Sequence, residues 1–305
     1  MFAIAMSLKK GLHLNIIHNL DRPFNEIMLG LESWIPIYMT GQVSPFYLKA
    51  SKNDIYHHLN YVSGGFALTG ECIKGFHNKG MYYLTNKEKE IKYYKEKAEL
   101  LLKKASPLMD IYKEENKKNM NYSYKKMKKY YVIEKEFYLP YHCLNLLLEI
   151  RERNNLSKED ITNIIKYKNK EKNYIENILK NNKISDYIYL INKKEFEKNP
   201  VCLQLNNMFY TKEISYTYEE YIKHLEQTKN YTKKDNNYQL NYNNNITFSN
   251  ITITITNNYY VTISKNINPT IHFVIKHPKL IEAIKNFSSL VKKIYNFKAE
   301  KYIPL

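Results

Sequence analysis

All eight glycines of this 305-residue chain lie within its first 80 residues, a bias that limits what each part of the chain can fold into. Glycine tolerates a positive φ and lets backbones approach closely, so the N-terminal part predicts a compact domain with tight turns. The glycine-free remainder favours longer regular elements. At roughly 150 residues per domain, the length indicates about two domains. The glycines are Gly11, Gly30, Gly41, Gly64, Gly65, Gly70, Gly75 and Gly80.

Residues 1–85 predict an α/β domain. Apolar periodicity and flanking turn residues indicate strand, helix, strand, strand in that order, after a short initial helix. Gly11 marks the C-cap of that initial helix, Asp21 caps the later one, and Pro36 interrupts it. The predicted elements are a helix at 2–10, a strand at 12–18, a helix at 21–36, a strand at 43–48, and a hairpin at 57–68 that turns at Gly64-Gly65.

Residues 86–198 predict a lysine-rich helical region, because they lack glycine and hold only two prolines. Helices are predicted at 87–109 and 141–153 from their apolar periodicity. A third begins at Ser157, where Ser157 and Asp160 form a variant of the capping box. The many tyrosines here are interpreted as helix packing.

Residues 199–305 predict a small α/β domain. Its asparagine-rich stretch, 228–245, predicts an exposed loop. Alternating isoleucine and threonine predict a β-hairpin, and Pro278 suits the first turn of a helix. The chain as a whole is predicted to be of the α/β (α+β) class. The predicted elements are strands at 251–255, 259–263 and 271–275 and a helix at 278–287.

The net charge of +17 taken alone suggests an anionic partner such as nucleic acid. Arginine, which most often reads bases, occurs only at Arg22, Arg151 and Arg153. Lysine, asparagine, tyrosine and isoleucine are abundant, a composition that AT-rich codons favour. The charge therefore carries little weight, and we expect DNA to be contacted chiefly through an upstream domain that this chain lacks.

Three widely spaced cysteines, Cys72, Cys143 and Cys202, favour a reducing compartment over a disulfide framework and show no zinc-ligand spacing. Each is predicted to be a buried small hydrophobe. No apolar run approaches the ~20 residues of a membrane span, and the first residues do not resemble an export signal. We therefore expect a cytoplasmic protein without membrane contact, metal or cofactor.

His18, Asp21 and Arg22 form the first candidate site. They follow a predicted strand and stand at the start of a predicted helix, whose free amides and positive end favour an anion. The guanidinium of Arg22 adds to that attraction. A small anionic ligand, such as a phosphate or carboxylate compound, is therefore the expected partner. A helix cap by Asp21 with an ion pair to Arg22 explains the same residues without a ligand, and this alternative stays open.

The stretch 57–71, with His58, Asn60 and Gly65, resembles one half of the phospholipase D-like fold. That resemblance implies a phosphodiesterase site built from two halves, each supplying a histidine and a lysine two residues later. Aligning His58 with the family histidine puts Asn60 at the lysine position and Gly65 at the aspartate position, so no catalytic residue is predicted. His58 and Asn60 stay candidates for ligand binding, with a scaffold strand as the alternative.

Ser264 and Lys265, with His272, Lys276 and His277 nearby, form a third candidate, a serine nucleophile beside a lysine. Adjacent residues on a strand point to opposite faces, so Ser264 and Lys265 are not expected to share a hydrogen bond. A polar strand end is the favoured interpretation.

Three stretches resemble the region that follows the helix-turn-helix in XRE-like transcriptional regulators of Gram-positive anaerobes. The resemblance implies a DNA-binding regulator that senses an effector, here without its own helix-turn-helix. The stretches are 11–48 with Ile16-Ile17-His18-Asn19-Leu20-Asp21-Arg22-Pro23-Phe24, 62–80 with Ala67-Leu68-Thr69-Gly70-Glu71, and 263–287 with Ile271-His272-Phe273-Val274-Ile275.

The sequence thus favours a non-enzymatic effector-sensing and oligomerisation region of a transcription regulator, acting as a homo-oligomer. Two alternatives stay open. One is a residual phosphodiesterase or nuclease that works as a dimer. The other is a lysine-rich nucleic-acid-binding protein, whose affinity would fall steeply with salt.

Overall fold

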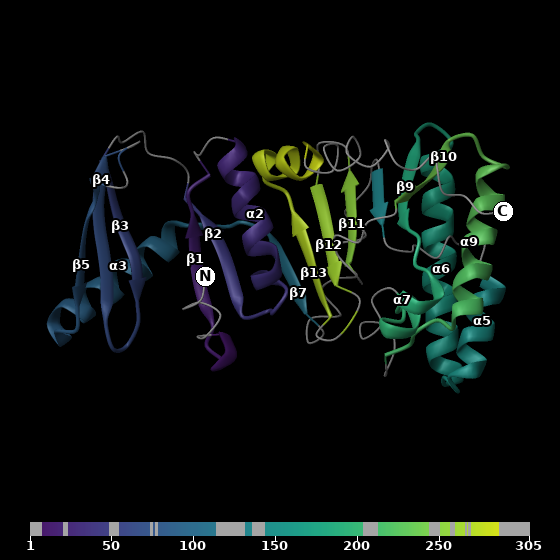
Figure 1. Cartoon of the computed structure of the whole chain (residues 1–305), viewed down its shortest axis with the longest axis horizontal. Coiled ribbons are helices and arrows are strands. Elements are labelled where there is room, and N and C mark those ends of the chain that lie inside the picture. The colour runs from purple at the N-terminus through teal and green to yellow at the C-terminus, as the bar shows by residue number, and fades with distance from the viewer. Residues whose placement is uncertain are drawn as a thin grey trace. The chain divides into compact units, whose positions relative to one another are not determined.

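The computed structural model of the chain is a mixed α/β structure with several small sheets (Figure 1). Contacts divide it into two compact units: unit 1 comprises 1–26 and 42–108, and unit 2 comprises 27–41 and 109–305. The predicted division near residues 85 and 198 stays a prediction. The residues that the structure describes are 8–20, 24–48, 55–73, 76, 79–113, 132–135, 144–203, 213–243, 251–256, 260–265, 267 and 270–286.

The first sheet of unit 1 contains two parallel strands, β1 (Leu14–His18) and β2 (Val43–Tyr47). β6 (Ser106–Pro107) pairs antiparallel with β2. Parallel strands need a crossover, and α2 (Phe24–Tyr38) lies between β1 and β2 in the chain. Both strand predictions for this region are confirmed.

The helix α2 does not end at Pro36 as predicted but continues to Tyr38. A proline in the last turn removes one helical hydrogen bond, and only two helical residues follow it. The chain leaves the helix at Gly41, which has a φ of +73° and whose N–H donates to the carbonyl of Tyr38 at 2.9 Å. Glycine in the left-handed region, rather than proline, is therefore the stop signal.

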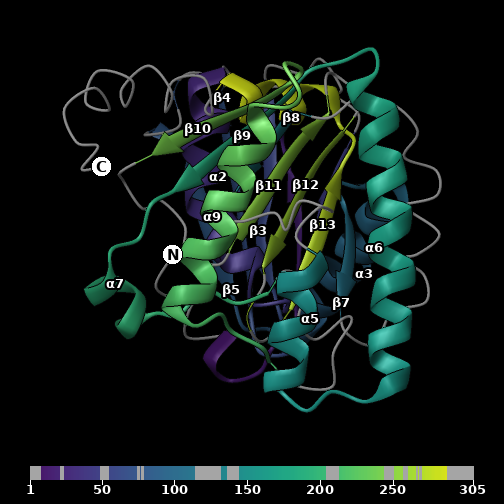
Figure 2. The same cartoon turned by 90° about the vertical axis from the view of Figure 1, so that its right-hand side faces the viewer.

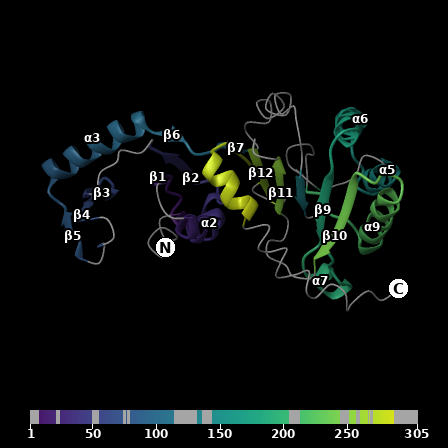
Figure 3. The ribbon, with the colours of Figure 1, turned by 90° about the horizontal axis from the view of Figure 1, so that it is seen from above.

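The second sheet of unit 1 is antiparallel, in the order β3 (Ile55–Val62), β4 (Ala67–Ile73) and β5 (Met81–Thr85). The predicted hairpin between β3 and β4 is confirmed, whereas β5 was not predicted. The helix α3 (Glu88–Lys104) lies along this sheet (Figure 3) and contacts β3 and β4.

The helices predicted within 86–198 are present as α3, α5 (Leu144–Arg153) and α6 (Lys158–Leu179), but the described residues of this stretch also form strands that were not predicted. α3 stops at Lys104, because Ser106 precedes Pro107 and a residue before proline avoids the helical region. Period-two burial of Ile184, Asp186 and Ile188 marks a strand that the high lysine content obscures. The strands in this stretch are β6, β7 (Asp110–Lys113), β8 (Val132–Lys135) and β9 (Ile184–Tyr189).

A five-stranded antiparallel sheet in unit 2 has the order β7-β13-β12-β11-β8. The predicted hairpin is confirmed as β11 (Ile251–Thr256) and β12 (Tyr260–Lys265), and the next predicted strand as β13 (Ile271–Ile275). Every residue of β13 is buried, so both faces of this strand are covered. The helix after Pro278 is confirmed as far as residue 286.

Helices pack around a second, parallel strand pair in unit 2, β9 with β10 (Tyr238–Asn243). α9 (Tyr218–Thr232) lies near β10 (Figure 2). The loop predicted at 228–245 is therefore wrong among the described residues, because Tyr238 is only 5% exposed and packs with α6. The other helices are α5 (Leu144–Arg153), α6 (Lys158–Leu179) and α7 (Lys193–Lys198).

A capping box fixes the start of α9. The Thr217 side chain accepts a hydrogen bond from the Glu220 backbone N–H at 3.2 Å, and the Glu220 carboxylate accepts one from the Thr217 N–H at 2.7 Å. We expect Thr217→Ala to lower the free energy of unfolding by about 1 kcal/mol, measured by urea titration. Thr162→Ala, at an exposed position within α6, is the control, and a loss equal to that of Thr217→Ala would contradict the cap.

Candidate functional site

The carboxyl ends of β1 and β2 lie side by side in unit 1. The register pairs His18 with Tyr47, the last residue of each strand, and both side chains are half-buried. The described part of α2 begins at Phe24, six residues after His18, and its first turn carries the exposed Glu26. The carboxyl edge of parallel strands followed by a helix N-terminus is the place where α/β proteins bind ligands.

The other predicted ligand-binding residues fall in two places. Asp21 and Arg22 lie outside the described residues, on the connection between His18 and α2. His58 pairs with Gly70 within the β3–β4 ladder, and Asn60 lies where the register shifts between Leu59 and Tyr61.

The structure places His18 and His58 on different sheets of unit 1, so strand pairing does not bring the two histidines together. Tyr47, in contrast, was not predicted as a neighbour of His18. The sequence feature that could have predicted this neighbour is the position of Tyr47 at the end of the next predicted strand.

Ser264 forms a pair with His272, not with Lys265. The two residues are direct cross-strand neighbours on β12 and β13, and Ser264 Oγ lies 2.7 Å from His272 Nδ1. The Tyr112 ring of β7 lies beside the imidazole, with ring centroids 6.1 Å apart. The expected separation of Ser264 from Lys265 follows from their adjacent positions on one strand.

A serine beside a histidine is the arrangement of a nucleophile with its base, but this pair is closed to substrates. Ser264 is 2% exposed and His272 is fully buried. Burial lowers the pKa of His272 to about 4, because the charged form loses its hydration. The imidazole is therefore neutral near pH 7, and the pair links two central strands of the sheet. Lys276 binds Asp110 instead, at 2.5 Å.

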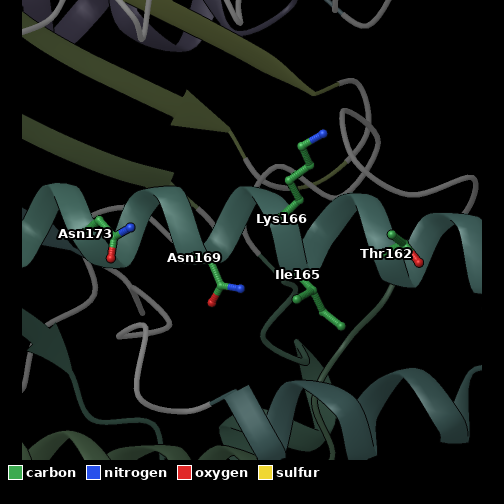
Figure 4. A pocket seen from close by; sticks show the side chains of 5 residues that line it. All are labelled: Thr162, Ile165, Lys166, Asn169 and Asn173. Carbon is green, nitrogen blue, oxygen red and sulfur yellow. The ribbon is translucent and has the colours of Figure 1, made fainter.

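A pocket of about 460 Å³ lies along α6 in unit 2. Its lining residues recur at helical spacing, yet the side chains of Ile165 and Asn169 extend to one side of the helix and that of Lys166 to the other (Figure 4). The polar groups therefore do not converge on one point, as they would in a specific ligand site. The lining residues are Thr162, Ile165, Lys166, Asn169 and Asn173.

Two of the three arginines make contacts within unit 2. Arg151 is fully buried on α5, and its Nη1 lies 3.5 Å from the Ile161 carbonyl of α6. Arg153 donates to both carboxylate oxygens of Glu220 at 2.9 Å and to the Ser215 carbonyl at 2.7 Å. These two guanidinium groups connect α5 to α6, to α9 and to the segment before α9. Arg22 lies outside the described residues, so its part in ligand binding stays a prediction.

The predicted burial is confirmed for Cys72 and Cys202, while Cys143 lies outside the described residues. Among the side chains that the structure describes, no cluster of three or more histidine, cysteine or acidic residues could hold a metal ion. No described helix is long and apolar enough to cross a membrane. No protein-family model, no curated protein and no solved structure matches the chain.

Proposed function

We propose that this chain is the effector-sensing and oligomerisation region of a transcription regulator, without an enzymatic activity of its own. Its effector is a small anion bound at the carboxyl edge of β1 and β2. The observation that carries the proposal is the pairing of His18 with Tyr47 at this edge, with α2 beginning six residues after His18. The resemblance of 11–48, 62–80 and 263–287 to XRE-like regulators supports the regulatory part.

The chemistry of the edge suits an anion of modest size. The half-buried His18 and Tyr47 carry an imidazole and a phenol hydroxyl, groups that bind phosphate or carboxylate oxygens, and both already take part in an interaction within the chain. Arg22, on the connection that follows, adds a planar fork that matches the same oxygens. Glu26 already lies at the positive end of α2, so we expect moderate rather than very tight affinity.

A thermal-shift screen against phosphorylated metabolites, nucleotides and short DNA duplexes, each at two salt concentrations, tests this function. One small anion should stabilise the protein at both salt concentrations. At a ligand concentration 100 times Kd, the free energy of unfolding should rise by about 2.7 kcal/mol.

Two variants locate the effect. Arg22→Ala should abolish the stabilisation by the anion. Lys104→Ala removes an exposed cation from the end of α3 in the same unit and should leave the stabilisation by the anion unchanged. Equal loss in both variants would mean nonspecific charge attraction. Stabilisation by DNA at low salt only, with no response to any small anion, would favour the nucleic-acid-binding alternative instead.

A further inference from the structure

Strand β5 lies at the edge of its sheet. Within the described residues it pairs only with β4, which makes it the last strand of its sheet (Figure 1). Native edge strands normally carry a lysine, a proline or a bulge that prevents pairing with another chain. The sequence Met-Tyr-Tyr-Leu-Thr of β5 contains none of these. The opposite edge differs, because β3 is irregular near Asn60 and contacts α3.

Four consecutive apolar side chains of β5 are exposed on both faces of the sheet: Met81 by 80%, Tyr82 by 55%, Tyr83 by 46% and Leu84 by 64%. The hydroxyl of Tyr83 donates to Glu90 of α3 at 2.9 Å. The neighbouring Tyr82 covers Gly70 on the other face, where an added Cβ would come within 2.6 Å of its ring. Both rings are thus held in place while roughly half of each stays uncovered, which lowers the entropy lost on binding.

We propose that β5 is the edge through which a second copy of this chain pairs, antiparallel and related by a twofold axis. An antiparallel pair centred on Tyr83 places Tyr82 opposite Leu84 of the second copy, on the same face. Aromatic residues opposite aliphatic ones are favourable cross-strand neighbours. The resulting sheet has six strands, and each edge amide that faced water gains a partner.

Charge favours a second copy at this edge. Two chains that each carry +17 repel one another, so they can meet only where positive charge is low. β5 holds no charged residue. Of the two lysines that flank it, Lys87 is paired with Glu90 at 3.3 Å, and the ammonium of Lys79 lies 5.9 Å from the Phe76 ring centroid. A nucleic acid would instead need a basic surface between the aromatic rings.

The area agrees with a dimer of moderate affinity. A fully exposed aromatic side chain offers about 150–250 Å², so the four β5 side chains and the nearby Ile73 and Phe76, exposed by 59% and 55%, present roughly 600 Å². Standard interfaces bury about 800 Å² per partner. We therefore expect a dimer that dissociates on dilution, with a Kd on the order of 1–100 μM.

Sedimentation velocity of the full chain, from low to high micromolar concentration, tests the proposal with three matched variants. Leu84→Glu and Met81→Glu lie at the same edge but on opposite faces, and each should raise the dimer Kd about tenfold or more. Leu12→Glu, at an exposed position before β1 in the same unit, should leave Kd unchanged. Circular dichroism confirms folding, since all three side chains are exposed.

Three outcomes would overturn the proposal. One is a wild-type chain that stays monomeric at 200 μM. Another is a dimer weakened by Leu84→Glu but not by Met81→Glu, which would mean face-to-face stacking. The third is a monomer that binds a single-stranded oligonucleotide in a manner sensitive to Leu84→Glu. The inference rests on the oligomerisation part of the proposed function, and its readout is independent of the anion, so either can fail alone.

Discussion

Phe273→Ala is expected to lower the free energy of unfolding by about 3–5 kcal/mol, the usual cost of removing a buried aromatic ring. Phe273 lies at the centre of β13, between β12 and β7, and is 2% exposed. Its neighbours are held by strand pairing on both sides, so the cavity cannot close easily. Urea unfolding followed by circular dichroism measures the change.

Phe76→Ala is the matched control for this prediction. Phe76 is 55% exposed, and the ammonium of Lys79 lies over its ring, 5.9 Å from the ring centroid. At protein concentrations at which the chain is monomeric, a surface truncation of this kind should change the free energy of unfolding by about 0.5 kcal/mol or less. If the two variants lost the same amount, the five-stranded sheet would not form the core of unit 2.

Acidification below pH 6.5 is expected to destabilise the chain through His272. Its pKa is about 4 in the folded state, lowered by burial, and about 6.5 in the unfolded chain. The unfolded chain therefore binds this proton first, so stability is complete above pH 6.5 and is lost as the pH falls toward 4. The loss from this residue should reach about 2 kcal/mol by pH 5 and about 3 kcal/mol by pH 4.

His272→Gln separates this effect from that of the other titrating groups. Glutamine can still hydrogen bond with Ser264 but does not titrate. Urea unfolding at pH 7.5 and pH 5 should show a stability loss about 2 kcal/mol smaller in the variant than in the wild type. An identical pH dependence in both proteins would mean that the pKa of His272 is not lowered by folding.

The sequence predicts elements well where local pattern and burial agree. Alternating isoleucine and threonine at 251–255 gave the hairpin of β11 and β12, because this period fits a strand alone. The asparagines of 228–245 hid α9 and β10, whose burial depends on a few residues such as Tyr238. The ends of helices depend on the conformation of single residues. The prediction ended α2 at Pro36, whereas the chain leaves this helix at Gly41, which has a positive φ.

The candidate site was harder to predict than the fold. His18 could be predicted from its place between a strand and a helix, but its neighbour Tyr47 depends on the register of two strands about 30 residues apart. The contact of Ser264 with His272 likewise comes from cross-strand pairing. Spacing within one segment contains no information on such contacts. The exposed edge of β5 also became evident only when the order of the strands was known.

The central claim, an anion site at the carboxyl edge of β1 and β2, is tested most directly by NMR on protein with isotope-labelled histidine. The anion that gives the largest thermal shift is titrated into the protein, and the His18 and His272 signals are assigned with His18→Gln and His272→Gln. The His18 signal should move and saturate with the same Kd as the thermal shift, while that of the buried His272 should stay in place. Saturable binding without any movement of His18 would contradict this site.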